Sequence, residues 1–145
     1  MVALLDVNVV VALAWPNHVH HVAAHTWLSS WTDRWATTAV TEAGFVRVSS
    51  SGIASAAAVR PVDAISLFGR IRGHPNHDFW PDTIEGVVGN AVAPERVLGH
   101  RQATDAHLLA LAITQGGTVA TFDAGMRSLV VGRRHARHVT VLSAT

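Results

Sequence analysis

The sequence contains no cysteine, which excludes disulfide bonds and zinc sites with thiolate ligands. This absence is compatible with a reducing cytoplasm, where we expect the protein to be located. No apolar run is long enough to span a membrane, and no basic region precedes the first apolar run. We therefore expect neither a membrane anchor nor a signal peptide.

Charged residues are scarce, making up 14% of the chain against 49% for apolar residues. This composition excludes a disordered chain, and 145 residues are enough for one domain with a sizeable core, which we place at residues 1–145. The low charge and the five tryptophans predict an apolar surface that a partner covers. We expect a homodimer and a tightly bound protein partner.

Lysine is absent as well, because all 11 basic residues are arginine, the side chain best suited to bidentate phosphate contacts. Four arginines in the last twenty residues are candidates for contacts with RNA phosphates, namely Arg127, Arg133, Arg134 and Arg137. A solvated surface face is the alternative explanation for this cluster.

The first predicted strand, residues 2–8, is an apolar run that delivers Asp6 near its end. Such a run is typical of a strand buried on both faces of a parallel sheet. A carboxylate is costly inside the strand, but at the carboxyl end it can face the crevice where open α/β sheets bind ligands. The predicted strand 118–122, followed by Asp123, repeats this pattern near the other end of the chain.

Helical and extended patterns alternate along the chain, which predicts an α/β domain with a mostly parallel sheet. The predicted helices span residues 9–15, 18–35, 40–48, 61–72 and 104–115, and further short strands span residues 35–38, 78–80 and 139–142. Asn8 and Thr104 are the predicted N-caps of the first and last helices, and Gly116 ends the last one. Residues 49–58 are small and polar, which predicts a mobile connection.

Four acids occupy equivalent places in this pattern. Asp6 and Asp123 follow strands, whereas Glu42 and Asp105 lie in the first turns of helices. Each alone has an ordinary explanation as a cap, a turn residue or a complement to a helix dipole. In a parallel α/β sheet, however, all four positions lie on one edge. Four carboxylates there would repel one another unless a divalent cation neutralised them, and oxygen ligands favour Mg²⁺ or Mn²⁺. The pattern thus predicts metal-dependent phosphoryl-transfer chemistry.

At these residues the sequence resembles the PIN-domain ribonucleases, and in particular the VapC toxins of bacterial type II toxin–antitoxin pairs. The matching stretches are Leu4-Leu5-Asp6-Val7-Asn8, Thr38-Ala39-Val40-Thr41-Glu42, Thr104-Asp105-Ala106-His107-Leu108 and Thr121-Phe122-Asp123-Ala124-Gly125. Two further stretches, Trp15-Pro16-Asn17-His18 and Phe45-Val46-Arg47, are similar to the mycobacterial branch of that family.

The resemblance implies a PIN-like three-layer α/β/α fold with a mostly parallel central sheet. It also implies endonucleolytic cleavage of RNA with Mg²⁺ or Mn²⁺, leaving a 3′-hydroxyl and a 5′-phosphate, with transfer RNA the expected substrate. The expected partners are a cognate VapB-type antitoxin, whose tail covers the acidic pocket, and a second copy of the chain.

The same resemblance assigns roles to individual residues. The implied catalytic acids are Asp6, Glu42, Asp105 and Asp123. Of these, the three aspartates would hold the metal directly or through water, and Glu42 would orient the attacking water. The implied supporting residues, which hold carboxylates by hydrogen bonds, are Asn8, Thr104 and Thr121.

Several other functions fit the sequence less well. Phosphatases with an aspartyl nucleophile also begin with a strand that ends in Asp-x-Asp, but Asn8 stands here in place of the second acid. Their pattern and that of phosphotransfer receiver domains both call for a lysine, which this chain lacks. His21 and His25 share a helical spacing but lack the glutamate and third ligand of a zinc site. His107 is expected to pack, because it points to a different helix face from Asp105. A nonenzymatic RNA-binding module and a PIN-like nuclease outside a toxin–antitoxin pair remain open.

Overall fold

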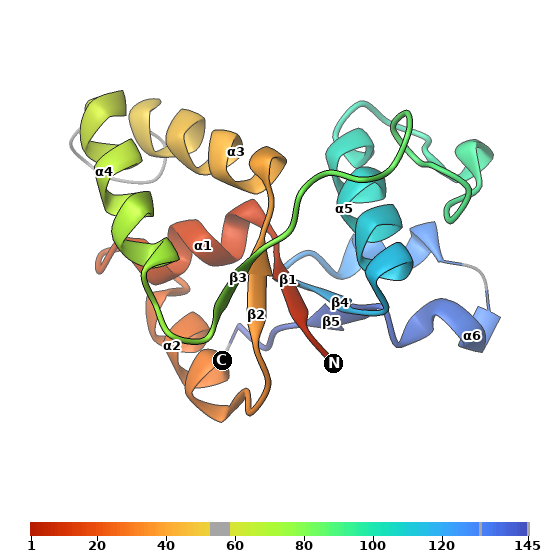
Figure 1. Ribbon diagram of the computed structural model, residues 1–145, viewed down its shortest axis with the longest axis horizontal. Helices are drawn as coiled ribbons and strands as arrows, with labels where there is room; N and C mark the ends of the chain where they lie inside the picture. Colours follow the sequence, from red (N-terminus) through yellow and green to blue (C-terminus); the bar gives the residue numbers. More distant parts are fainter. Residues whose placement is uncertain (53–58, 131, 145) are drawn as a thin grey trace.

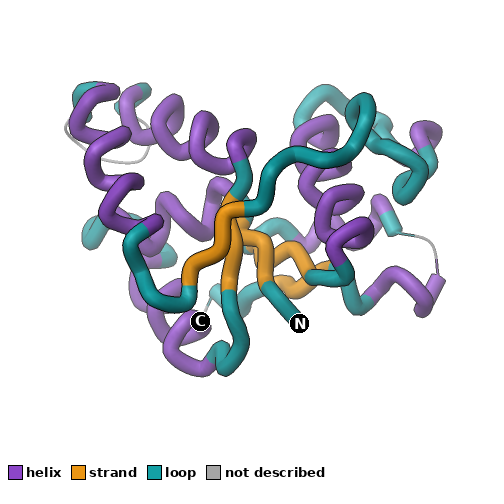
Figure 2. The backbone as a smooth tube through the Cα atoms, viewed as in Figure 1, coloured by secondary structure: helices purple, strands orange, loops and turns teal. Residues whose placement is uncertain are grey.

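A computed structural model of the chain describes residues 1–52, 59–130 and 132–144. Its centre is a five-stranded sheet in the order β3-β2-β1-β4-β5, with every pair of neighbours parallel. The strands are β1 (Ala3–Leu5), β2 (Trp35–Thr37), β3 (His77–Phe79), β4 (Thr118–Thr121) and β5 (Val139–Val141). Figure 2 shows these strands gathered between two groups of helices.

Helices cover both faces of the sheet, as Figure 1 shows. One group comprises α1 (Val7–Ala14), α2 (His21–Ser30), α3 (Ala39–Ser50) and α4 (Pro61–Arg72). The other side carries α5 (Gln102–Gln115), the 3-10 helices η1 (Pro94–Arg96) and η2 (Ala124–Leu129), and the short α6 (Gly132–Ala136). The predicted three-layer α/β/α architecture is therefore confirmed, and the sheet is parallel throughout its described strands.

The alternation of side chains along β1 explains the two cores. Ala3 and Leu5 are fully buried with Phe45 and the helices of the first group, whereas Leu4 is fully buried on the opposite face against α5. Because successive side chains of a strand point to opposite faces, one short apolar run supplies both cores. None of the helices in the described ranges is both long and apolar enough to cross a bilayer.

The start of the chain corrects one prediction. The strand ends at Leu5 instead of Asn8, and helix α1 begins at Val7 instead of Val9. The predicted N-cap was wrong for the same reason: the Asp6 side chain itself accepts a 2.7 Å hydrogen bond from the Val7 amide and caps the helix. Asn8 lies inside the helix, and its side chain forms hydrogen bonds with Thr121 and Phe122.

Other predicted boundaries also shift. Helix α2 spans only His21–Ser30, so it is shorter than the predicted helix over residues 18–35. Helix α5 begins at Gln102 with Arg101 at the N-cap position, so Thr104 is not the cap. The Gln102 side chain explains the earlier start, because its Oε1 accepts the amides of Leu98 and Gly99 and closes the preceding turn.

The remaining elements agree more closely with the sequence. Helices α3 and α4 cover the predicted segments 40–48 and 61–72, and Gly116 ends α5 in a left-handed conformation with φ 71°. Strand β3 begins one residue before the predicted 78–80, whereas β4 and β5 each end one residue early. Helices η2 and α6 were not predicted. Most of the connection 49–58 lies outside the described residues, and its first two residues belong to α3.

Candidate active site

Three aspartates converge at the carboxyl edge of the two central strands. Asp6 follows β1 and is only 5% exposed, whereas Asp123 follows β4 and is exposed. Asp105 is partly buried in the first turn of α5. The paired neighbours Leu5 and Ala120 place the ends of β1 and β4 side by side. Residues separated by more than 100 positions in the sequence therefore share one edge.

The pKa values of Asp6 and Asp105 reflect their burial and, to a lesser extent, the carboxylates beside them. Burial raises the pKa of Asp105 from 3.8 to about 7, and repulsion from the carboxylates of Asp6 and Asp123 contributes to the rise. Burial is also the main cause that raises the pKa of Asp6; hydrogen bonds from Thr121 and the Val7 amide oppose it, and repulsion from Asp123 adds to it. Each aspartate thus lies within the electric field of another.

The Thr121 hydroxyl connects two of these acids. Its Oγ1 donates to Asp6 Oδ2 at 2.7 Å and accepts the Asp123 amide at 3.0 Å and the Asn8 Nδ2 amide at 3.3 Å. A hydroxyl has one proton and two acceptor lone pairs, so all of its hydrogen-bonding capacity is in use. Thr121 can therefore only donate to Asp6, which fixes that carboxylate in one orientation.

Asn8 strengthens the same connection from helix α1. Its Oδ1 accepts the Phe122 amide at 3.2 Å while its Nδ2 donates to Thr121. Because Phe122 gives its amide to a side chain, β4 ends at Thr121. Two of the three predicted supporting residues, Asn8 and Thr121, thus contact the acids or their neighbours. Thr104 is exposed, and no hydrogen bond within the described ranges joins its hydroxyl to an acid.

Glu42 lies beside this cluster but is not part of it. Its neighbour Thr41 donates to the Leu5 carbonyl at 3.1 Å, which anchors the start of α3 next to Asp6. The Glu42 carboxylate itself forms an ion pair with Arg72, at 2.6 Å from Nη2 to Oε1. The structure therefore brings three of the four predicted catalytic acids together and holds the fourth at the rim through a residue that sequence reasoning missed.

The four predicted phosphate-binding arginines lie on or beside different elements of the fold. Arg127 lies in η2, four residues after Asp123, and so lies near the acidic edge. Arg137 precedes β5, which runs parallel to β4, so it lies at the opposite edge of the sheet. Arg133 and Arg134 are exposed on α6 between these positions. Of the four, Arg127 belongs to the element that follows the acidic edge directly.

His107 has the packing role expected for it. Its Nδ1 lies 2.8 Å from the Val87 carbonyl and its Nε2 lies 2.6 Å from Asp82 Oδ2, so both nitrogens contact the segment that follows β3. The ring ties this segment to helix α5.

The donor set at the acidic edge fits a hard divalent cation. None of the ion pairs among the described residues involves Asp6, Asp105 or Asp123, so their negative charge has no cationic side-chain partner there. All their donor atoms are oxygens, as Mg²⁺ and Mn²⁺ prefer. Within the described ranges, however, no three carboxylate or imidazole groups stand close enough to hold one ion as they are. A cation there requires side-chain rotation or bridging water.

Fold and site together define a class of protein: a parallel α/β domain that gathers three aspartates at one edge of its sheet. A family model described as PIN domain matches residues 3–131. Ribonuclease VapC39 of Mycobacterium tuberculosis is 46% identical over 127 residues, 87% of this chain and 91% of the relative. Ribonuclease VapC38 of that organism is 42% identical over 132 residues (90% and 92%), and Ribonuclease VapC44 is 36% identical over 143 residues (98% and 100%). The chain therefore belongs to the VapC branch of the PIN-domain family.

Proposed function

We propose that this protein is the toxin of a type II toxin–antitoxin pair and acts as a divalent-metal-dependent endoribonuclease. The observation that carries the proposal is the convergence of Asp6, Asp105 and Asp123 with no cationic side-chain partner among the described residues. The names of the similar proteins, all called ribonucleases, support RNA as the substrate. Transfer RNA is the substrate we propose, cut to leave a 3′-hydroxyl and a 5′-phosphate.

We assign different roles to the residues of the site. Asp6, Asp105 and Asp123 would hold Mg²⁺ or Mn²⁺, which when bound polarises a phosphate oxygen and activates water. Thr121 and the Val7 amide each donate to one oxygen of the Asp6 carboxylate, so each oxygen keeps acceptor capacity. Glu42 would orient the attacking water from the rim of the site.

We also propose a VapB-type antitoxin and a second copy of the chain as partners, in the cytoplasm. Exposed apolar side chains support a surface that a partner covers. Val19, just before α2, is 84% exposed, Val22 on α2 is 76% exposed, and Ile65 on α4 is 59% exposed. Co-expression with the product of the neighbouring gene, followed by size-exclusion chromatography with light scattering, tests both. A monomer that binds no neighbouring product would contradict them.

The catalytic proposal is tested by incubating the purified protein with transfer RNA and total RNA in Mn²⁺, Mg²⁺ or EDTA. We expect discrete cleavage with either metal and none in EDTA. Asp6→Asn should abolish cleavage while keeping α1 capped, because asparagine caps helices as well as aspartate does. Asp63→Asn, an exposed acid in α4 paired with Arg60, is the matched control and should leave cleavage unchanged.

Two results would contradict this function. Cleavage that persists in EDTA, or in the Asp6→Asn protein, would contradict the proposed metal site. Binding of RNA without cleavage under any metal would favour the nonenzymatic RNA-binding module instead.

A further inference from the structure

The Glu42 carboxylate is held by one guanidinium group. Arg72, in the last turn of α4, places Nε 2.7 Å and Nη2 2.6 Å from the same oxygen, Glu42 Oε1. The Glu42 side chain is 14% exposed, whereas that of Arg72 is 54% exposed. The guanidinium carbon also lies 5.6 Å from the centre of the Phe79 ring, which limits how the fork can turn. Two donors therefore fix one oxygen of Glu42 and leave the other, Oε2, uncommitted to Arg72.

The second oxygen has only a weak partner. The Thr37 hydroxyl lies 3.5 Å from Glu42 Oε2 but 2.7 Å from His77 Nε2. Burial lowers the pKa of His77, and His77 also has a hydrogen bond with the backbone of Arg72. The ring nitrogen of His77 is therefore the nearer of the two partners of the Thr37 hydroxyl. Glu42 Oε2 thus has one long contact, from Thr37, where Oε1 has two short ones from Arg72.

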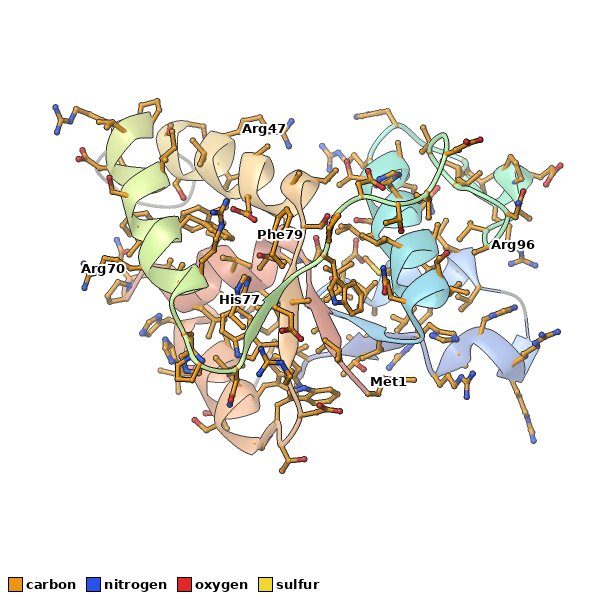
Figure 3. The ribbon with its side chains drawn as sticks, in the orientation of Figure 1. Met1, Arg47, Arg70, His77, Phe79 and Arg96 are labelled. Carbon is orange, nitrogen blue, oxygen red and sulfur yellow. The ribbon has the colours of Figure 1, made fainter. Side chains whose placement is uncertain are left out.

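The strands and helices bring this set together from three places. Thr37 ends β2, His77 begins β3, and Arg72 lies thirty residues from Glu42 in the sequence. Figure 3 shows His77 and Phe79 on β3 in the middle of the molecule, between the two helical groups. The support for Glu42 therefore comes from the outer part of the sheet and the end of α4, away from the three aspartates.

We propose that Arg72 is a positioning residue for RNA cleavage, which fixes Glu42 so that Oε2 is the oxygen presented to the attacking water. This inference rests on the proposed function. An ion pair with one half-exposed partner contributes little to stability. The value of the contact therefore lies in orientation, and its loss should affect turnover more than folding. Removing a partner that orients a catalytic group lowers activity by about 10–100-fold.

The test compares Arg72→Ala with Arg70→Ala, whose side chain is exposed two residues away on the same helix and points outward in Figure 3. For Arg72→Ala we expect kcat to fall about tenfold or more, with KM and the melting temperature nearly unchanged. Arg72→Lys should recover part of the loss, because lysine supplies the charge but not the two-donor fork. Added guanidinium ion should also raise the kcat of Arg72→Ala. Arg70→Ala should behave as the wild type does.

A double variant shows whether Arg72 acts through Glu42. Arg72→Ala combined with Glu42→Gln should cleave no more slowly than Glu42→Gln alone, because the carboxylate that Arg72 positions is already absent. Additive losses, or an unchanged or raised kcat in Arg72→Ala, would overturn the positioning role. If that occurs while EDTA and Asp6→Asn still abolish cleavage, the proposed function stands and only this inference fails. Absence of metal-dependent cleavage in the wild type would remove both.

Discussion

Asp105→Asn is expected to lower Mn²⁺-dependent RNA cleavage about a thousandfold or more, a loss of roughly 4 kcal/mol of transition-state stabilisation. The reason is that one of three charged ligands becomes neutral at a site whose function is to hold a cation. The same change is expected to stabilise the fold at neutral pH in the absence of metal. A variant that loses activity while gaining stability is difficult to explain by misfolding.

The sign of the stability change follows from the pKa of Asp105, which is raised from 3.8 to about 7. Between these two pH values the folded protein keeps a proton that the unfolded chain has lost, so stability falls as the pH rises from about 4 to about 7. Above that window the full penalty remains. Because Asp105 is only half-buried, we reduce the penalty for solvent screening to about 1–2 kcal/mol.

Denaturant unfolding at pH 5 and pH 8 without metal measures this difference. The free energy of unfolding of Asp105→Asn should exceed that of the wild type by more at pH 8 than at pH 5. The control Asp63→Asn should show no such dependence on pH. A variant that is less stable than the wild type at pH 8 would show that Asp105 does not carry the strained charge assigned to it.

The second large effect is expected from Thr121→Val, which keeps the shape of the side chain and removes its hydroxyl. The change deprives Asp6 Oδ2 of its donor, and the Asp123 amide and Asn8 of their acceptor. We expect kcat to fall about 10–100-fold because Asp6 loses its fixed orientation. We also expect about 1–3 kcal/mol of lost stability from the polar groups left unpaired.

Thr118→Val is the matched control on the same strand. Thr118 is equally buried, and its hydroxyl pairs with that of Thr140 at 2.9 Å near the opposite end of β4. This variant should lose stability but keep its kcat. Equal losses of activity in both variants would mean that the Thr121 hydroxyl acts only through the general stability of the strand.

The sequence was sufficient to predict the acidic edge, because its geometry depends only on element order. An acid after a parallel strand and an acid in the first turn of a helix must share one side of the sheet. For that reason Asp6, Asp105 and Asp123 were predicted together correctly, although their catalytic roles stay a prediction. The same rule located the start of α3, and hence Glu42, near them.

The rest depended on side-chain contacts that no periodicity reveals. The cap of α1 was misassigned because Asp6 and Asn8 are both good N-caps, and only the three-dimensional contacts give Asn8 to Thr121 and Phe122. Arg72 was missed because nothing in the sequence links it to an acid thirty residues earlier. The four arginines near the end were grouped by sequence proximity, but the fold distributes them between opposite edges of the sheet.

We propose above all that Asp6, Asp105 and Asp123 form one site for a divalent cation. Titrating the purified protein with Mn²⁺ and following free Mn²⁺ by electron paramagnetic resonance tests it without any need for RNA. We expect saturable binding by the wild type and by Asp63→Asn, and loss of that binding in both Asp6→Asn and Asp105→Asn. Equal binding by all four proteins, or no binding by the wild type, would contradict it.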